Sequence, residues 1–499
     1  MSGRILAGFL VVLLMTLVSS AEPTRVVQAE EILKKIELGQ PVEYQNVIVV
    51  GDLDLSGLDL PRVPAQRTYM EINRGLQYYD IVVTSPIRII NSIIEGSVNL
   101  KGTVFEKVTN FGGTKFEGPV FLTGSRFNDT ASFWEVEFND TCSFLYAQFN
   151  NAAYFSSVQF NQYADFYGTQ FNQDADFNAA KFNWNADFSW MQFNQTAYFY
   201  DAKFNQTAYF SWTQFNQTAL FSEALFNQAA IFWFAQFNQA ADFERAQFKQ
   251  TVDFSRTKFN QTTSFDSGKF SHFVGFFDAG FLDVSFDDSQ FSKEAFFDNA
   301  QINGTLSLYR TKYEILNIRW SSIHDLAYDD TAYHLLIQNF NKLGFGDDAS
   351  ECQYSYRCKH RAELFRQYKF DTWLFDLLAW ATYGYGLRPV RPLGWAALLI
   401  LMGGLFFFLT GSITRSKENK SEKKPLALRR REEPPNGNVS IWEAFLLSAT
   451  YFTSGASSII SATPTEFVPV GRGRYVVVIL RLMGWIFFVL FLSSLTRTV

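Results

Sequence analysis

Large apolar residues recur along the middle of the chain at alternating steps of five and six residues, so the full repeat is eleven residues long. The phenylalanines Phe127, Phe133, Phe138 and Phe144 belong to a series that continues to Phe281. An α-helix would space apolar residues by three and four, and an ordinary strand by two. A fixed short repeat instead predicts a solenoid, whose units bury their apolar sides by stacking on one another.

A small residue precedes every second phenylalanine of this series by two positions, as at Ala131, Cys142, Ala153 and Ala164. Steps of five and six fit a coil in which each side contributes one large and one small inward residue. Four sides then take two eleven-residue repeats, or 22 residues. We therefore predict a β-helix with phenylalanine ladders inside and alanines filling the corners.

This pattern resembles the pentapeptide-repeat family, whose units carry a small residue and then a large apolar residue two positions later. The familiar form advances in strict fives, whereas this chain inserts one residue on alternate sides. The resemblance covers residues 83–318, and we assign 83–320 to this domain. It implies a right-handed quadrilateral β-helix. The family includes DNA mimics, but here the outward acidic positions, such as Asp165 and Asp187, are interrupted by residues such as Tyr209.

Residues 22 positions apart should lie about 4.8 Å apart on neighbouring coils. Trp190, Trp212 and Phe234, here called the aromatic column, follow Gly168 in one such outward series. They are a candidate contact surface, and the alternative is local stacking on the coil's own face. Repeated asparagines are expected to form side-chain hydrogen-bond ladders: Asn161, Asn172, Asn183, Asn194, Asn205 and Asn216.

Residues 1–21 are typical of a secretory signal, with Arg4 before an apolar core and Ser19–Ala21 as a small-residue cleavage site. An uncleaved anchor is the alternative, and both place the following residues outside the cytoplasm. Residues 25–82 are expected to cap the first coil and prevent edge-to-edge growth. Within them we predict a helix over Glu30–Leu38 and an extended segment over Val47–Val50.

The chain has 499 residues and a net charge of −6, which argues against a basic nucleic-acid-binding surface. Its three cysteines and four histidines show no zinc-site spacing or disulfide framework. We expect no metal site, no cofactor and no catalytic residue, and therefore no enzymatic activity.

The repeat stops at about residue 320. Residues 321–390 predict a helical hairpin that caps the far end of the solenoid, with a first helix over Asp329–Leu343 and a second ending near Tyr368. The aromatic segment Trp373–Tyr385 is expected at the membrane surface. Basic residues of the second helix are predicted to form a solvated or lipid-headgroup face: Lys359, His360, Arg361 and Arg366.

Residues 391–499 contain two apolar segments, 393–413 and 475–495, each long enough to cross a bilayer core. The loop between 414 and 439 carries eight positive residues. Residues 440–469 then begin with a capping box at Ser440–Glu443 and a short helix ending near Phe452. That helix is too short to cross a membrane, and a polar, irregular segment follows. We predict a re-entrant pore helix and filter, because non-helical backbone at membrane depth must be buried in protein or line water.

This arrangement resembles the two-helix pore domain of the potassium-channel superfamily over residues 393–497. The resemblance rests on Tyr451–Phe452, Glu466–Pro469, Gly471–Arg474 and Gly484. In that family the residues before the acid form the filter Thr-Val-Gly-Tyr-Gly. Here Ser461–Thr465 takes that place without the glycines or the aromatic, so ion selectivity does not carry over. The candidate pore-lining residues are Ser457, Ser458, Ser461, Thr463, Thr465 and Glu466.

Three further residues are predicted to support this pore: Glu443, Arg481 and Gly484. An arginine inside a span is a candidate functional charge. Arg481 is expected either to pair with Glu466 or to reach the membrane interface by snorkelling. Gly484 is expected to be either a hinge or a close helix contact.

The signal places the solenoid outside, and the basic loop is then cytoplasmic, as the positive-inside rule requires. The pore segment would enter from the cytoplasmic side, as in ionotropic glutamate receptors. The expected protein is a multi-pass, tetrameric ion channel of the cell membrane, with monovalent cations as candidate permeant ions and the lipid bilayer as a partner. The alternative is a non-conducting, membrane-anchored binding or scaffold protein that displays the solenoid.

Overall fold

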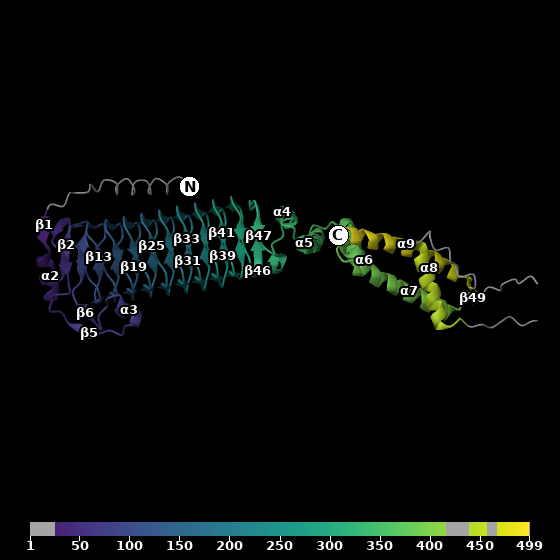
Figure 1. Ribbon diagram of the computed structural model, residues 1–499, viewed down its shortest axis with the longest axis horizontal. Helices are drawn as coiled ribbons and strands as arrows, with labels where there is room; N and C mark the ends of the chain where they lie inside the picture. Colours follow the sequence, from purple (N-terminus) through teal and green to yellow (C-terminus); the bar gives the residue numbers. More distant parts are fainter. Residues whose placement is uncertain (1–24, 416–438, 457–466, 499) are drawn as a thin grey trace, which may run out of the picture. The chain divides into compact units, whose positions relative to one another are not determined.

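The computed structural model describes residues 25–415, 439–456 and 467–498. The chain forms two compact units, Met1–Phe345 and Gly346–Val499 (Figure 1). The predicted secretory signal, residues 1–21, lies outside the described residues.

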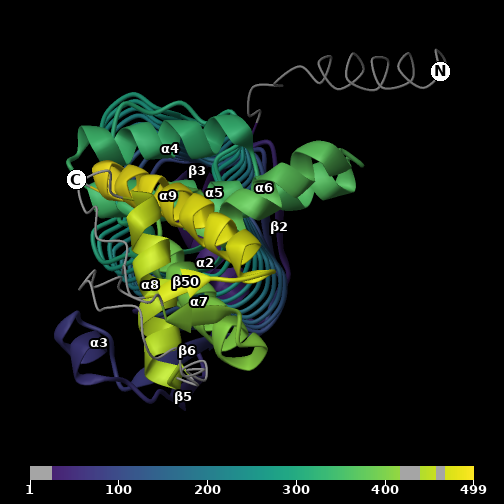
Figure 2. The ribbon, with the colours of Figure 1, turned by 90° about the vertical axis from the view of Figure 1, so that its right-hand side faces the viewer.

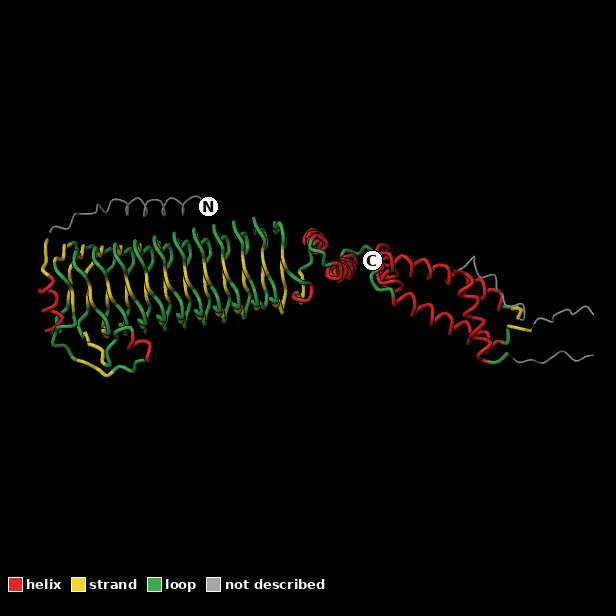
Figure 3. Tube along the Cα trace, viewed as in Figure 1, coloured by secondary structure: helices red, strands yellow, loops and turns green. Residues whose placement is uncertain are grey.

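The first unit is a β-solenoid in which each coil contributes four short strands (Figure 3). One coil consists of β14 (Arg126–Phe127), β15 (Ala131–Ser132), β16 (Glu137–Phe138) and β17 (Cys142–Ser143). The strand β18 (Gln148–Phe149) of the next coil pairs in parallel with β14 and places Phe149 beside Phe127. The predicted coil length of 22 residues is therefore confirmed. The pattern continues through β45 (Ala295–Phe296).

Phenylalanine rings fill the interior of the solenoid, and Figure 2 shows successive coils lying behind one another. The Phe127 and Phe149 rings stack with centroids 4.7 Å apart and planes 5° apart, and Phe149 stacks on Phe171 in the same way. This distance matches the spacing of hydrogen-bonded strands, so one ring per coil forms a continuous stack. Neighbouring stacks meet edge to face, as between Phe144 and Phe155. The predicted phenylalanine ladders are confirmed.

Asparagine side chains form two ladders along the outside of the solenoid. In the first, the Nδ2 of Asn194 donates to the Oδ1 of Asn172 at 2.7 Å, and Asn216 donates to Asn194 at 2.8 Å. In the second, Asn183 donates to Asn161 at 2.6 Å, and Asn205 continues the series. Each amide both donates and accepts, so the ladder satisfies polar groups that the coils bring together. The predicted ladders are confirmed.

The N-terminal residues cover the first coil. The strand β1 (Arg25–Gln28) pairs with β3 (Val47–Val50), and the helix α2 (Ala29–Glu37) buries Ile32 and Ile36 over the coil end. Both the predicted helix and the predicted extended segment are present. The strands β2 (Val42–Gln45) and β4 (Leu53–Asp54) complete this end.

An excursion of the chain between β4 and β6 (Tyr79–Val83) was not predicted. It contains the strand β5 (Arg62–Pro64) and the helix α3 (Tyr69–Asn73). β5 pairs antiparallel with β6, whereas the other strand pairs among the described residues of this unit are parallel. Residues 56–78 lack the phenylalanine repeat, so the sequence pattern did not reveal where this segment lies.

The far end of the solenoid is covered by the helix α4 (Asp330–Lys342), after β47 (Leu316–Asn317) and β48 (Ile323–Leu326). The amide of Asn339 accepts from the backbone N–H of Leu316 at 3.0 Å and donates to its carbonyl at 2.8 Å. A side chain thereby replaces the missing next strand. The helix α5 (Gly346–Arg366) begins the second unit, so the hairpin of α4 with α5 stays a prediction.

The second unit contains α5, α6 (Phe370–Tyr383), α7 (Val390–Thr410), α8 (Ile441–Ala456) and α9 (Gly473–Thr498). In length and composition α7 and α9 can cross a membrane, and 17% and 22% of their most apolar stretches are buried. A core helix of a soluble protein would be mostly buried, so this exposure favours a lipid or protein neighbour. The helix α8 ends at Ala456, one turn beyond the predicted end near Phe452.

Candidate functional site

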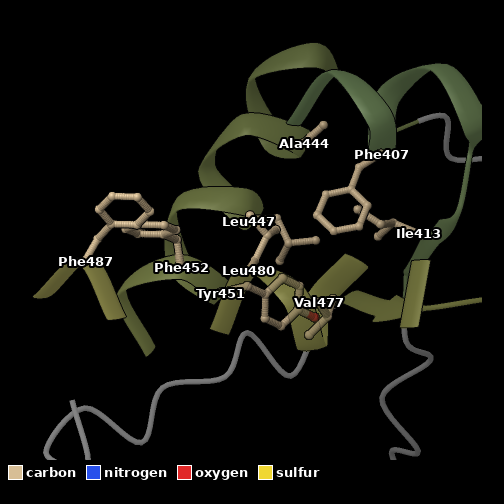
Figure 4. Close-up of a cluster of buried hydrophobic side chains, with 9 residues drawn as sticks. All are labelled: Phe407, Ile413, Ala444, Leu447, Tyr451, Phe452, Val477, Leu480 and Phe487. Carbon is tan, nitrogen blue, oxygen red and sulfur yellow. The ribbon is translucent and has the colours of Figure 1, made fainter. Parts of the chain in front are cut away.

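The three helices α7, α8 and α9 share one apolar core, and Figure 4 shows its side chains. Phe407 comes from α7, Leu447 from α8 and Leu480 from α9, and all three are buried. The full cluster is Phe407, Ile413, Ala444, Leu447, Tyr451, Phe452, Val477, Leu480 and Phe487. Because α8 contributes residues that touch both apolar helices, it is an integral part of this bundle.

Glycines allow α8 to approach its neighbours closely. A Cβ placed on Gly403 of α7 would lie 2.4 Å from the Oγ of Ser448, and one on Gly404 would lie 2.2 Å from the Phe445 ring. On α9, a Cβ at Gly484 would lie 1.9 Å from the carbonyl oxygen of Phe452. Small residues at such contacts let helix backbones pack tightly. Gly484 is therefore a close helix contact, and a hinge at this position stays a prediction.

These contacts give the direction of α8. Its first half lies against Gly404, close to the C-terminal end of α7, and Phe452 in its second half lies against Gly484. Gly484 follows the first residue of α9 by eleven residues, or about 16 Å along a helix. The last turn of α8 thus lies near the middle of α9, about half the thickness of a bilayer core from its start.

Two short strands join the connections on either side of α8. The strand β49 (Ile413–Arg415), which follows α7, pairs antiparallel with β50 (Phe467–Pro469), which precedes α9. The Val470 N–H also donates to the Ser412 carbonyl at 2.8 Å. The end of α7 and the beginning of α9 therefore meet at one end of the bundle. The chain leaves α7 and arrives at α9 at this end, and the first half of α8 lies against Gly404, close to the same end of α7.

The predicted capping box at the start of α8 is present. The Glu443 side chain accepts from the Ser440 backbone N–H at 2.8 Å, and the Ser440 hydroxyl accepts from the Glu443 backbone N–H at 3.3 Å. Both bonds satisfy backbone donors that have no partner within the helix. Glu443 therefore fixes where α8 begins.

The predicted pore-lining residues, Ser457, Ser458, Ser461, Thr463, Thr465 and Glu466, lie outside the described residues. The pairing of Arg481 with Glu466 accordingly stays a prediction. The described neighbour of Arg481 is Tyr451, whose ring centroid lies 5.4 Å from the guanidinium carbon. A cation over an aromatic face is favourable, and it connects α9 to α8 one turn before the Gly484 contact.

Two arginines, one in α5 and one just before α7, form hydrogen bonds, an ion pair and aromatic contacts where α5, α6 and the start of α7 meet. Arg388, two residues before α7, donates to both carboxylate oxygens of Glu351 at 2.7 Å and so joins the start of α7 to α5. Arg361 donates to the Tyr385 hydroxyl at 3.0 Å and lies 4.5 Å from the centroid of the Trp380 ring. Arg361 is only partly buried, so its place on a solvated or headgroup face stays a prediction. Its packing against α6 was not visible in the sequence.

The aromatic column lies on the outside of the solenoid, as predicted. Trp190 stacks on Trp212 with centroids 5.0 Å apart, and Trp212 stacks on Phe234 at 4.1 Å. All three have left-handed backbone angles, with φ between 56° and 61°, which is unfavourable for bulky residues. Arg256 covers the free face of Phe234, with its guanidinium carbon 5.2 Å from the ring centroid. The rings of the aromatic column therefore stack on one another, as the local-stacking alternative expects. Contact of the column with a partner stays a prediction.

Carboxylates stack on one another where the acidic positions of neighbouring coils coincide. Asp165 lies beside Asp187 in paired strands and accepts from the Tyr167 backbone N–H at 3.1 Å. Burial, with a further contribution from the charge of Asp187, raises the pKa of Asp165 from 3.8 to about 6. Within the described ranges, no group of three His, Cys, Asp or Glu side chains could hold a metal ion.

Sequence reasoning missed the glycine pair on α7, the Tyr451 neighbour of Arg481 and the arginine network. Gly403 and Gly404 stand together in an apolar span, a small-residue signal for helix contact that the sequence does contain. The other two features join residues far apart in the chain and leave no local signal.

Comparison with known families supports the solenoid. Residues 90–137, 133–181 and 180–236 match the family model described as pentapeptide repeats (9 copies). No curated protein and no solved structure matches the chain. The chain therefore carries pentapeptide repeats in a solenoid. The matched residues all belong to the first unit, so the pore-domain resemblance rests on the residues of the second unit alone.

Proposed function

We propose that this chain, in which pentapeptide repeats form a solenoid ahead of two apolar helices, is an ion-conducting protein of the cell membrane. In this proposal α7 and α9 cross the bilayer, and α8 dips into it without crossing. The observation that carries the proposal is that Phe452, in the second half of α8, lies beside Gly484, near the middle of α9, while β49 and β50 pair at one end of the bundle.

The exposed face of α8 supports assembly of several copies. Trp442 and Leu446 are 80% and 70% exposed, and Thr453 lies exposed further along the same helix. One chain provides one dip, which cannot enclose a water-filled path by itself. A homo-tetramer would cover this face and would place four segments 457–466 around one axis, with monovalent cations as candidate ions.

The solenoid in this proposal is a right-handed quadrilateral β-helix that lies outside the cytoplasm. The secretory signal over 1–21 and the eight positive residues between 414 and 439 support this orientation independently. The solenoid would act as the sensing or interaction domain of the channel.

A second candidate function is favoured by one specific observation. Ser461–Thr465, at the filter position, contains neither glycine nor an aromatic residue. A pore fold that has lost its filter would leave a non-conducting, membrane-anchored scaffold that displays the solenoid.

Recording from purified protein in planar bilayers separates the two functions. The channel proposal expects discrete conductance steps, and it expects Glu466→Gln to change the preference between cations and anions because a charge beside the path is removed. Glu433→Gln, in the loop between the two spans, is the matched control. Absence of conductance under all ionic conditions would favour the scaffold.

A further inference from the structure

The excursion between β4 and β6 forms a pocket where it rejoins the solenoid (β5, β6 and α3 in Figure 1). The pocket has a volume of about 170 Å³, which is below the usual range for drug-sized ligands and limits it to a molecule of a few heavy atoms up to the size of a single ring. Leu76 and Ile81 provide apolar wall, and Gly102 adds backbone from the next coil.

The excursion is held firmly in place. Leu76 is buried and packs onto Gly124, where a Cβ would lie 2.5 Å from its side chain. Arg67 forms a buried ion pair with Asp80. A capping box between Thr68 and Glu71 fixes the start of α3. The pocket walls are therefore preformed, which lowers the entropic cost of binding.

The lining of the pocket is positively charged. It contains Arg62 and Lys101 and no aspartate or glutamate. The Arg62 guanidinium carbon lies 4.8 Å from the centroid of the Tyr79 ring, and the Lys101 Nζ lies 4.5 Å from the centroid of the Phe121 ring. Neither cation forms an ion pair with a carboxylate in the part of the chain that the structure describes.

The two cations can reach one ligand group. Arg62 pairs with Ile81, and Ile81 pairs with Thr103, which follows Lys101 by two residues. Two strand spacings separate the backbones of Arg62 and Thr103 by about 10 Å. Lys101 lies two residues before Thr103, within the combined reach of two long side chains that line the same pocket.

The excursion also interrupts a hydrogen bond that several other threonines of the solenoid form. In later coils a buried threonine donates to the carbonyl 25 residues earlier, as Thr169 does to Phe144 at 2.7 Å. For Thr103 that carbonyl belongs to Tyr78, which accepts instead from the Ala65 N–H. The Thr103 hydroxyl is buried without a described partner. A segment that displaces a buried hydrogen bond of the fold calls for a compensating role.

We propose that this pocket binds a small organic acid. Its carboxylate lies between Arg62 and Lys101, and its body packs on Leu76 and Ile81. The inference rests on the proposed function in one respect, since it names the ligand class that the solenoid senses.

Equilibrium binding to the full chain in detergent tests this inference with sodium butyrate, benzoate and glucuronate. At least one acid is expected to bind with a Kd below about 1 mM. Its uncharged amide is expected to bind at least tenfold more weakly. Arg62→Gln and Lys101→Gln should each weaken binding at least tenfold, whereas the exposed controls Arg88→Gln and Lys107→Gln should leave it unchanged.

Failure of all three acids to bind at 10 mM would overturn the inference, as would equal binding by the amide or by the two pocket variants. Far-UV circular dichroism confirms that the variants retain the solenoid. Ligand binding is measured independently of ion conduction. A protein that conducts ions but binds none of the acids would therefore contradict the ligand proposal and leave the channel proposal standing. Binding of an acid by a protein that never conducts would contradict the channel proposal alone.

Discussion

Gly484 of α9 lies so close to Phe452 of α8 that a Cβ on the glycine would stand 1.9 Å from the Phe452 carbonyl oxygen. Backbone, rather than a flexible side chain, occupies the space. The close approach of α8 to α9 therefore depends on a residue that has no side chain.

Gly484→Ala should push α8 away from α9. We expect a loss of about 1–3 kcal/mol in the stability of the detergent-solubilised bundle, the usual cost of overpacking. Gly394→Ala on α7 is the matched control, because a Cβ there meets nothing within 4 Å, and it should be neutral or slightly stabilising. Thermal unfolding followed by helical circular dichroism measures both. Equal behaviour of the two variants would show that α8 does not pack against Gly484.

Phe199→Ala should destabilise the solenoid by about 3–5 kcal/mol, because a fully buried ring is replaced by a cavity. Trp190→Gly should change the stability by less than about 1 kcal/mol, since loss of one ring stack is offset by relief of a left-handed backbone. Gly168 already occupies the equivalent position one coil earlier. Chemical denaturation measures the free energy of unfolding of both variants. A larger loss for Trp190→Gly than for Phe199→Ala would contradict the assignment of Phe199 to the interior and Trp190 to the outside of the solenoid.

Asp165→Asn should alter the pH dependence of stability. The folded-state pKa of Asp165 is raised from 3.8 to about 6, so this group's contribution is complete below pH 3.8 and is lost as the pH rises through 6. Asparagine keeps an oxygen for the Tyr167 N–H and carries no charge. The variant should match the wild type at pH 3.5 and exceed it by about 1–2 kcal/mol at pH 7.5, a value reduced for the partial exposure of the carboxyl.

Denaturation at these two pH values, with Asp298→Asn as an exposed control, measures the effect. A gain in the free energy of unfolding that is the same at pH 3.5 and pH 7.5 would show that the gain does not come from removing a buried charge.

The interior of the solenoid could be predicted because every coil repeats the same packing problem. Phe127 and Phe149 report the coil length directly, and the asparagine ladders follow from it. Residues 56–78 could not be placed, since Arg62 and Leu76 belong to no repeat. In the second unit, the capping box at Glu443 is a local signal and was found. The contact of Gly484 with Phe452 and that of Arg481 with Tyr451 depend on packing between helices, which local patterns do not encode.

The most direct test of the account is the depth and sidedness of the segment between the two spans. Single cysteines are introduced at Thr414, Thr453 and Arg472, after replacement of Cys142, Cys352 and Cys358. We predict that a membrane-impermeant thiol reagent reaches positions 414 and 472 from the same side. We also predict that a fluorophore at position 453 is quenched by nitroxides deep in the acyl chains. Labelling of 414 and 472 from opposite sides, or quenching of 453 by headgroup nitroxides alone, would contradict a re-entrant segment and the conduction proposed from it.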